Sequence, residues 1–228
     1  MEQKLNMFKS KKPVIAIDGT SGSGKGTLAR KIAAATAFDH LDTGCLYRYL
    51  AYLGINRNEN IEAIISKNPR IDLLELYKLD LKTESISKQS SIIAQKKIVR
   101  DFLIKFQREF ANNPPSGFGS VIDGRDIASK IVPYAEIKFF VDADINTRTN
   151  RRVQEIKKNR KSNFVFQKIH DQLLERDKRD KARKESPLMR TRDSIYINTS
   201  DLKPDAVLKI ALSKFQSIFP NMPIKHCT

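Results

Sequence analysis

The first candidate for chemistry is a glycine-rich loop, GTSGSGKGT, at positions 19–27. It follows the apolar run Val14–Ile17 and has the spacing G-x-x-x-x-G-K. In this pattern backbone N–H groups surround phosphate oxygens, and the lysine, here Lys25, reaches the outer phosphates. Gly26 stands where the common pattern has a hydroxyl, and Thr27 comes one residue later. A simple glycine–serine turn is the alternative, but the strand before the loop and the helix expected after it favour a phosphate site.

A second candidate is the stretch DTGCLYR at positions 42–48, at the end of a short expected strand. Asp42 and Thr43 have side chains that commonly cap the first turn of a helix. Tyr47 and Arg48 would then lie in the second turn. From there the arginine can point over the mouth of the sheet, where open α/β folds bind ligands. The spacing alone leaves both the capping role and the ligand role open.

A third candidate is VIDGRD at positions 121–126. Asp123 ends an apolar strand, where nucleotide-binding folds hold Mg²⁺, usually through its water shell. Arg125 and Asp126 follow a glycine, so we expect them on a turn at the same edge of the sheet. For Asp126 the alternative is an N-cap on the next helix.

Two charged stretches complete the candidates. Arg148, Arg151 and Arg152 follow VDAD with helical spacing, and their mutual repulsion favours an anion nearby, although a solvated basic helix has the same pattern. The segment ERDKRDKAR at 175–183 places charges three and four residues apart along one side of a helix. Intrahelical ion pairs are enough to explain that spacing when the segment is considered alone.

These candidates need a framework that brings them together. Apolar strand-like runs alternate with amphipathic helical patterns, which predicts an α/β fold with a parallel sheet. Strands are expected at 14–17, up to Leu41, at 121–122, at 137–141 and at 195–198, and helices at 27–37, 46–53, 61–66, 91–110 and 204–218. We expect Gly54 to end the second helix and 71–82, IDLLELYKLDLK, to form a strand pair. The range 56–115 then makes an insertion on one side of the core, and KKNRKSN, 157–163, a basic link.

Composition limits the class of protein. The chain has 228 residues, enough for one domain with a full core. Lys+Arg 42 against Asp+Glu 26 gives a net charge of +16, which favours anionic partners or a solvated lysine-rich surface. The two cysteines, Cys45 and Cys227, and the lack of an apolar leader or membrane span favour a reducing, cytoplasmic setting. The histidines, His40, His170 and His226, lack metal-ligand spacing and are expected at the surface.

In their order along the chain, these motifs resemble those of bacterial cytidylate kinases, a family of nucleoside-monophosphate kinases. The family pattern has G-P-S-G-S/A-G-K-G-T, D-S/T-G-x-x-Y-R, V-A-x-x-x-x-V-R with a serine nearby, D-G-R-D, D-A-x-x-x-x-R-x-x-R-R and R-D-x-x-D-x-x-R-x-x-x-P-L. This chain has GTSGSGKGT, DTGCLYR, SSIIAQKKIVR, DGRD, DADINTRTNRR and RDKRDKARKESPL. The matches extend from about Val14 to Leu188, and their shared order and spacing argue against coincidence.

The resemblance implies a P-loop nucleoside-monophosphate kinase fold: a parallel five-stranded sheet flanked by helices, with an NMP-binding insertion and a short lid. It implies one domain over 1–228, with its core at 13–55, 116–156 and 184–220, the insertion at 56–115 and the lid at 157–168. It implies transfer of the γ-phosphoryl group of ATP to CMP or dCMP, with Mg²⁺ as cofactor. It also favours a monomer with no specific nucleic-acid partner and no membrane association.

Carried over residue by residue, the resemblance implies three groups of contacts. The ATP contacts would be Gly19, Thr20, Ser21, Gly22, Ser23, Gly24, Lys25, Gly26, Thr27 and Arg148. The CMP contacts would be Thr43, Tyr47, Arg48, Ser91, Arg100, Arg125, Asp126, Arg176, Asp180 and Arg183. Catalysis would fall to Lys25, Arg125, Arg151, Arg152 and Arg183, and Mg²⁺ would be held by Thr27 and Asp123, partly through water.

Within the CMP set, the family positions for the base are Ser91, Arg100 and Asp126, those for the phosphate are Arg48, Arg125 and Arg183, and those for the ribose are Arg176 and Asp180. The chain departs from the family in two notable places. Thr20 replaces the usual proline and is expected on the exposed side of the loop. The insertion between Asp42 and Ser91 is shorter than in longer bacterial members, so its small sheet is expected to be reduced.

Two other functions compete with this one. A phosphate-loop kinase for AMP, UMP, dTMP or a small metabolite such as shikimate would share the glycine loop, and the acceptor-side motifs argue against it. An RNA- or DNA-binding protein would use the net charge of +16. However, the tyrosines and phenylalanines are not interleaved with basic clusters as they are in stacking platforms.

Overall fold

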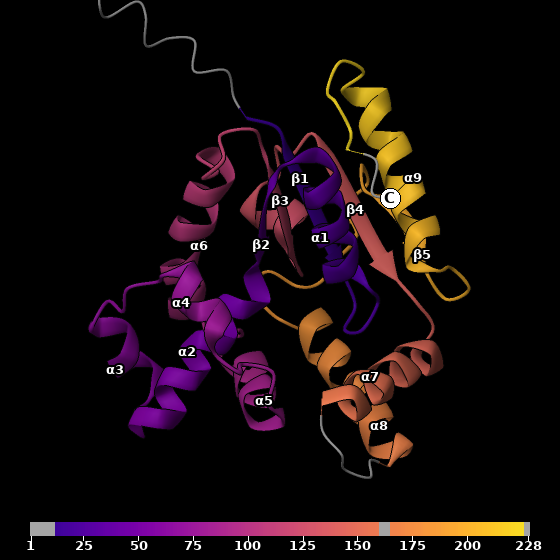
Figure 1. The fold of residues 1–228 in the computed structure, drawn as a ribbon. Helices are drawn as coiled ribbons and strands as arrows, with labels where there is room; N and C mark the ends of the chain where they lie inside the picture. Colours follow the sequence, from indigo (N-terminus) through magenta and orange to yellow (C-terminus); the bar gives the residue numbers. More distant parts are fainter. Residues whose placement is uncertain (1–11, 160–164, 226–228) are drawn as a thin grey trace, which may run out of the picture.

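A computed structural model describes residues 12–159 and 165–225. At its centre is a parallel sheet of five strands in the order β2-β3-β1-β4-β5 (Figure 1). The strands are β1 (Val14–Gly19), β2 (Asp39–Asp42), β3 (Ser120–Gly124), β4 (Ile137–Asp142) and β5 (Ile195–Asn198). The expected α/β class and all five expected strands are confirmed.

The middle strand, β1, is buried along its whole length because helices cover both faces of the sheet. Successive side chains of a strand point to opposite faces. Ile15 and Ile17 accordingly join one core cluster, and Val14 and Ala16 join the other. A strand buried on both faces has an unbroken apolar sequence, which is why the run before the glycine loop shows no alternation.

Two helices cover the first of these faces: α1 (Lys25–Thr36), which follows the glycine loop, and α9 (Pro204–Ile218) (Figure 1). Pro204 is well placed in the first turn of α9, where no N–H is needed for the helix. Phe215 of α9 is 1% exposed and meets Phe38 edge-on, with ring centres 5.6 Å apart.

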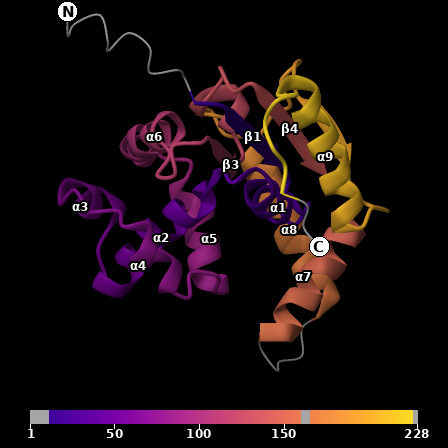
Figure 2. The same ribbon diagram turned by 45° about the horizontal axis from the view of Figure 1, so that its top comes forward.

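The second face carries a larger group of helices. The π-helix η2 (Ile127–Ile131) and α6 (Lys97–Asn112) contribute to the core against the sheet. From this layer α2 (Thr43–Arg57), α3 (Ile61–Ser66), α4 (Leu73–Lys78) and α5 (Glu84–Ile93) extend to one side of the sheet (Figures 1 and 2).

On the other side, α7 (Ile145–Asn159) and α8 (Phe166–Lys181) pack together near the end of β4 (Figure 1). The basic link expected at 157–163 begins within α7, which continues to Asn159, and residues 160–164 lie outside the described part of the chain. Across the described residues, no helix is both long and apolar enough to cross a membrane.

The helices α2–α5 on one side and the α7–α8 pair on the other touch through polar and charged side chains. Gln172 of α8 donates to Glu84 of α5 at 2.6 Å, and Lys168 lies 3.3 Å from the same carboxylate. Lys82, just before α5, lies 3.7 Å from Glu155 of α7. The helices on the two sides of the sheet therefore meet across its edge.

The expected strand pair at 71–82 is wrong, because this segment forms α4. Asp72 caps the helix: its carboxylate accepts from the backbone N–H of Leu74 at 3.0 Å and of Glu75 at 3.4 Å. Leu76 is the buried residue of this short helix. Capping and a single buried leucine outweigh the partial alternation of apolar residues, so the described part of the insertion contains helices and no small sheet.

The second helix, α2, continues beyond the expected stop at Gly54. It begins as predicted, with Asp42 accepting from the Cys45 N–H at 3.3 Å, but it ends at Asn58 in the left-handed conformation. Gly54 has a different use: Glu59 N donates to its carbonyl, and the Glu59 carbonyl lies 3.2 Å from where a Cβ would be. The glycine therefore allows the chain to fold back against α2.

The single helix expected over 91–110 is wrong, because two helices, α5 and α6, occupy this region. Arg100 explains the break: its Nη1 donates to the carbonyl of Ala94 at 2.9 Å. This bond satisfies an oxygen at the C-terminal end of α5 that a continuous helix would satisfy with a backbone N–H. The arginine thus turns the chain between the two helices.

Replacing Phe215 by alanine is expected to lower the free energy of unfolding by about 3–5 kcal/mol, because the change leaves a cavity between α9 and the sheet. Urea unfolding measures this difference. Phe118→Ala is the matched control, since Phe118 is 64% exposed and should change stability by less than about 0.5 kcal/mol. Equal losses in the two variants would contradict the core role of Phe215.

Candidate active site

The strands end together at one edge of the sheet, and this edge is rich in carboxylates. Asp42 of β2 lies beside Asp123 of β3 in register, and Asp142 ends β4. Asp18 is the last residue of β1 but one. Because a loop or helix N-terminus follows each strand here, this edge is the place where an open α/β sheet binds ligands.

The glycine loop leaves β1 at this edge and turns directly into α1. Gly19 passes so close to β4 that a Cβ would lie 2.0 Å from the Val141 carbonyl oxygen. Gly24 has φ 91° before the first residue of α1, a conformation that residues with a Cβ adopt only at a cost. No described side chain caps the N–H groups at the start of α1, so they are available to an anion.

Thr20 is buried, contrary to the expectation that it lies on the exposed side of the loop. It is 2% exposed, and its hydroxyl donates to Asp142 at 2.5 Å. Proline, which the family commonly has here, offers no donor for such a bond. The replacement therefore ties the loop to the end of β4.

Arg148 is buried against the loop backbone. Its Nη1 donates to the Ser21 carbonyl at 3.1 Å and pairs with Asp177 of α8, and its Nε donates to the Ala143 carbonyl at 2.8 Å. Asp177 also accepts from the Ser21 N–H at 3.1 Å. In the structure Arg148 and Asp177 thus hold the loop, and the sequence analysis had considered Asp177 only as an intrahelical ion-pair partner.

The other two arginines of α7 also have protein partners. Arg151 donates to the Thr199 hydroxyl at 2.9 Å, and that hydroxyl donates to the Ser23 carbonyl at 2.9 Å. Arg152 pairs with Glu155 one turn later at 2.7 Å. Thr199 was missed by the sequence analysis because it follows the last strand and belongs to no motif.

Lys25 lies among charged groups at the glycine loop. Burial lowers the pKa of its amine to about 7, and the charges of Arg125 and Arg176 act in the same direction. The carboxylates of Asp123 and Asp42 oppose this shift only in part. A bound polyphosphate would favour the charged amine and raise its pKa.

Asp180 of α8 is shared by two arginines. The Arg125 Nε lies 2.8 Å from one carboxylate oxygen, and Arg183 donates to the other. Burial alone would raise the pKa of Asp180, but attraction to the two arginines outweighs it and holds the pKa below its ordinary value. Arg48 is held in a similar way by Asp42 at 2.8 Å.

Arg176 lies near these arginines but forms no ion pair with any residue that the structure describes. Burial lowers its pKa to about 10, and Arg125 contributes to the shift. Its Nε is buried without a hydrogen-bond partner in the described part of the chain, as are the Nε atoms of Arg48 and Arg183. Buried donors that are left unpaired among like charges indicate an anion-binding site.

Beside this anion site, Arg100 of α6 and Asp126 form a buried ion pair. The Arg100 guanidinium lies 5.7 Å from the centre of the Tyr47 ring. Asp126 makes no side-chain cap bond to η2, so the capping alternative is wrong. The Ser91 hydroxyl of α5 accepts a hydrogen bond from the Arg179 Nε at 3.3 Å.

His40 is not at the surface, contrary to expectation. Its side chain is 15% exposed, and Nε2 lies 2.7 Å from Asp123. His40 lies opposite Val121 of β3, and its ring reaches Asp123 two residues further along that strand. His170, 20% exposed in its side chain, is partly buried, and His226 lies outside the described residues.

A carboxylate and a hydroxyl are suitable oxygen ligands for a hard divalent cation, and Asp123 and Thr27 offer one of each. Asp123 has one oxygen 3.6 Å from the Cβ position of Gly26, which places it against the loop beside Thr27. In the described ranges, no three His, Cys, Asp or Glu side chains are grouped to hold a metal. The site therefore fits an ion that keeps most of its ligands as water and phosphate oxygens.

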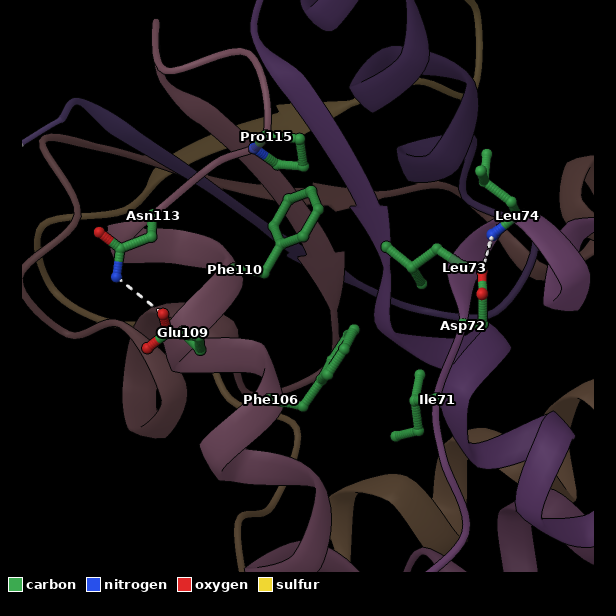
Figure 3. A pocket seen from close by; sticks show the side chains of 9 residues that line it. All are labelled: Ile71, Asp72, Leu73, Leu74, Phe106, Glu109, Phe110, Asn113 and Pro115. Carbon is green, nitrogen blue, oxygen red and sulfur yellow. Dashed lines mark hydrogen bonds between the residues drawn. The ribbon is translucent and has the colours of Figure 1, made fainter.

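A separate hollow of about 340 Å³ lies between the start of α4 and the C-terminal half of α6 (Figure 3). Its walls are mainly apolar, with Phe106 and Phe110 opposite Ile71 and Leu73. Asp72 and Glu109 at its border are the charged residues that line it, and both are acidic. This hollow is therefore unsuited to phosphate.

Comparison with known proteins settles the family. A family model described as cytidylate kinase matches residues 15–217. The chain belongs to this family. It is 42% identical to a cytidylate kinase of Bartonella tribocorum over 88% of this chain and 93% of that protein. It is 37% identical to a cytidylate kinase of Paramagnetospirillum magneticum over 87% and 95% of the two chains.

Two solved structures share the fold of this chain at lower sequence identity. A Thermus thermophilus protein has a TM-score of 0.51 at 17% identity, covering 91% of this chain and 98% of its own. An uncharacterized protein from Eubacterium ventriosum has a TM-score of 0.54 at 18% identity, covering 90% and 99%. These similarities confirm the architecture and say nothing of the substrate.

Binding of MgATP at pH 8 is expected to take up most of one proton per site, because Lys25 with a pKa of about 7 is mostly neutral without a ligand and charged when a polyanion is bound. Calorimetry in two buffers of different ionisation enthalpy measures the uptake. At pH 6, where the free amine is already mostly charged, the uptake should be much smaller. Lys25→Met is the control and should abolish it, whereas buffer-independent heats for the wild type would contradict the lowered pKa.

Proposed function

We propose that this family member transfers the γ-phosphoryl group of ATP to CMP or dCMP, giving ADP and CDP or dCDP. The observation that carries the proposal is a group of buried arginines, Arg48, Arg176 and Arg183, whose Nε donors have no hydrogen-bond partner in the described part of the chain. Arg176 lies close enough to the glycine loop to act on the charge of Lys25. The ends of the strands therefore provide one phosphate cradle for a donor and, beside it, a second cationic site for an acceptor nucleotide.

The acceptor needs no general base in such a reaction. The second pKa of a phosphate monoester is about 6, so the attacking oxygen is already mostly ionised at neutral pH. What limits the reaction is bringing two polyanions into line and stabilising charge on the transferred group. An active site made of a lysine and arginines meets that need.

On the donor side, we propose that the phosphates bind the loop from Gly19 to Thr27, with Lys25 at the outer phosphates. Arg148 contributes by holding this loop, since its guanidinium is occupied by Asp177 and the Ser21 carbonyl. Arg151 and Arg152 are proposed to reach the transferring group when the enzyme closes. Each would have to exchange a protein partner for phosphate.

On the acceptor side, we propose that Arg48, Arg125 and Arg183 bind the CMP phosphate and that Arg176 and Asp180 bind the ribose region. The cytosine base is assigned to Ser91, Arg100 and Asp126, with Thr43 and Tyr47 completing the site. The Arg100–Asp126 pair supports this assignment. It presents fixed donors and acceptors next to an aromatic ring, as recognition of a polar base requires.

Mg²⁺ is the proposed cofactor, held by Thr27 and Asp123 partly through water. When bound, the ion would neutralise charge on the donor phosphates. The His40 Nε2–H donates to one Asp123 oxygen and so fixes the orientation of the carboxylate toward the loop.

The remaining assignments are also proposals. We divide the single domain into a core at 13–55, 116–156 and 184–220, an insertion at 56–115 and a lid at 157–168 that excludes water from the reaction. We propose a cytoplasmic monomer without a nucleic-acid partner. The buried free thiol of Cys45 supports a reducing compartment.

An acceptor panel tests the function. Purified protein with MgATP is expected to release ADP in the presence of CMP or dCMP and much less with AMP, dTMP or shikimate. Release of ADP that does not depend on CMP or dCMP would refute the proposal. Salt-dependent binding of oligonucleotides without CMP turnover would favour the nucleic-acid alternative.

Asp126→Ala is expected to reduce the preference for CMP over UMP, measured as the ratio of kcat/KM values, by about 10-fold or more, because a buried group that recognises the base is lost. The melting temperature is measured alongside, since breaking a buried ion pair leaves Arg100 uncompensated. Asp101→Ala, at an exposed carboxylate paired with Lys97, is the matched control and should leave the ratio unchanged. An unchanged ratio in the Asp126 variant would show that the base contact is misassigned.

A further inference from the structure

The carboxylate of Asp18 joins the two halves of the proposed site. Asp18 is 1% exposed and directly precedes Gly19, the first residue of the glycine loop. Its two oxygens accept from the backbone N–H groups of Ile127 and Ala128, each at 2.8 Å. These residues begin η2, immediately after Arg125 and Asp126.

We propose that Asp18 is a positioning residue for the acceptor half of the site, because it anchors the turn that carries Arg125 and Asp126. The inference rests on the proposed function.

Other bonds hold the start of the turn and its two side chains: the Thr43 hydroxyl donates to the Asp123 carbonyl at 2.8 Å, Arg125 pairs with Asp180, and Asp126 pairs with Arg100. Asp18 binds the backbone N–H groups that follow the turn. β3 ends at Gly124, so Arg125 and Asp126 lie between the last strand residue and the first residue of η2. Asp126 has φ −141° and ψ 26°, outside the helical and extended regions. The Asp18 carboxylate binds the two N–H groups that follow the turn and so fixes where η2 begins. It thereby fixes the directions in which the Arg125 and Asp126 side chains leave the backbone.

The energetics of the site agree with this role. Burial raises the pKa of the Asp18 carboxyl to about 7, although the two N–H bonds act to lower it. A carboxylate at a fully buried position is unfavourable unless hydrogen bonds compensate it. Charge-assisted bonds to two consecutive backbone N–H groups offset part of that cost and are strongly directional.

A neighbouring strand offers a matched comparison. Asp142 is the last residue of β4. Its carboxylate also accepts two hydrogen bonds, from the Thr20 hydroxyl at 2.5 Å and from the Ala143 N–H at 2.9 Å. Asp142 therefore holds the donor loop, as Asp18 holds the acceptor turn. The two aspartates should affect the two substrates in opposite ways.

The test compares Asp18→Asn with Asp142→Ala in full-length protein at pH 8, above the pKa of Asp18. At position 18 an asparagine keeps the shape of the side chain but replaces one acceptor by an NH₂ group facing an N–H. In Asp18→Asn, we expect KM for CMP to rise by about 10-fold or more, the equivalent of losing one hydrogen bond to a charged group, with KM for ATP changed less than about twofold. Both Asp142 bonds go to one oxygen, which an asparagine would keep, so alanine is used there, and we expect Asp142→Ala to give the larger rise in KM for ATP.

The outcomes are distinct. If the wild type does not turn over CMP, the proposed function fails. If the wild type is active and Asp18→Asn raises both KM values equally, or neither, the inference about Asp18 fails. Should Asp18→Asn not fold, amide hydrogen exchange in the wild type decides. Slow exchange at Ile127 and Ala128 supports the anchor, and exchange at the rate of unprotected amides overturns it.

Discussion

Cations that repel one another have to stand side by side in this site before any ligand arrives, and carboxylates paired with them make that arrangement possible. The buried Asp180 holds Arg125 and Arg183 at once, and the partly exposed Asp42 holds Arg48. Removing one partner of a buried pair typically costs about 3–5 kcal/mol, so the arginines paired with Asp180 are fixed in place. A phosphate that enters the site therefore meets donors that need no further ordering.

The sheet supplies the common frame for this arrangement. The parallel strands end at one edge, and carboxylates at the ends of β1 and β4 each bind the backbone or a hydroxyl of the segment beside them. Loops that carry function are thus attached to the most buried part of the molecule. Their conformation is set by the sheet and does not depend on the propensities of the loop residues themselves.

Local signals were enough for much of the fold. The unbroken apolar run of β1, the glycines of the loop and Pro204 of α9 each act through their own backbone geometry, and the structure has the elements they predict. The sequence analysis failed where a distant group decides the outcome. Thr20 is buried because Asp142 lies beside it, and α6 starts anew because Arg100 takes the Ala94 carbonyl.

The same limit applies to the candidate site. Spacing placed Arg148, Arg151 and Arg152 on one helix with the correct periodicity, but it contained no information about Asp177 or Thr199, which occupy two of these arginines. His40 was assigned to the surface because it lacks metal-ligand spacing and has charged residues nearby in the sequence, whereas its partner, Asp123, comes from the adjacent strand. Which cations remain free is a tertiary property, and Arg176 could not be distinguished from the others by sequence.

The contact between α5 and the α7–α8 pair bears on how fast the enzyme can work. Glu84 meets Lys168 and Gln172, and Lys82 meets Glu155, through exposed side chains. Such pairs contribute about 1 kcal/mol or less each, and dissolved ions weaken them further. Contacts of this strength add little to the barrier for separating the two groups of helices, so a step that requires their separation would not be slowed by them.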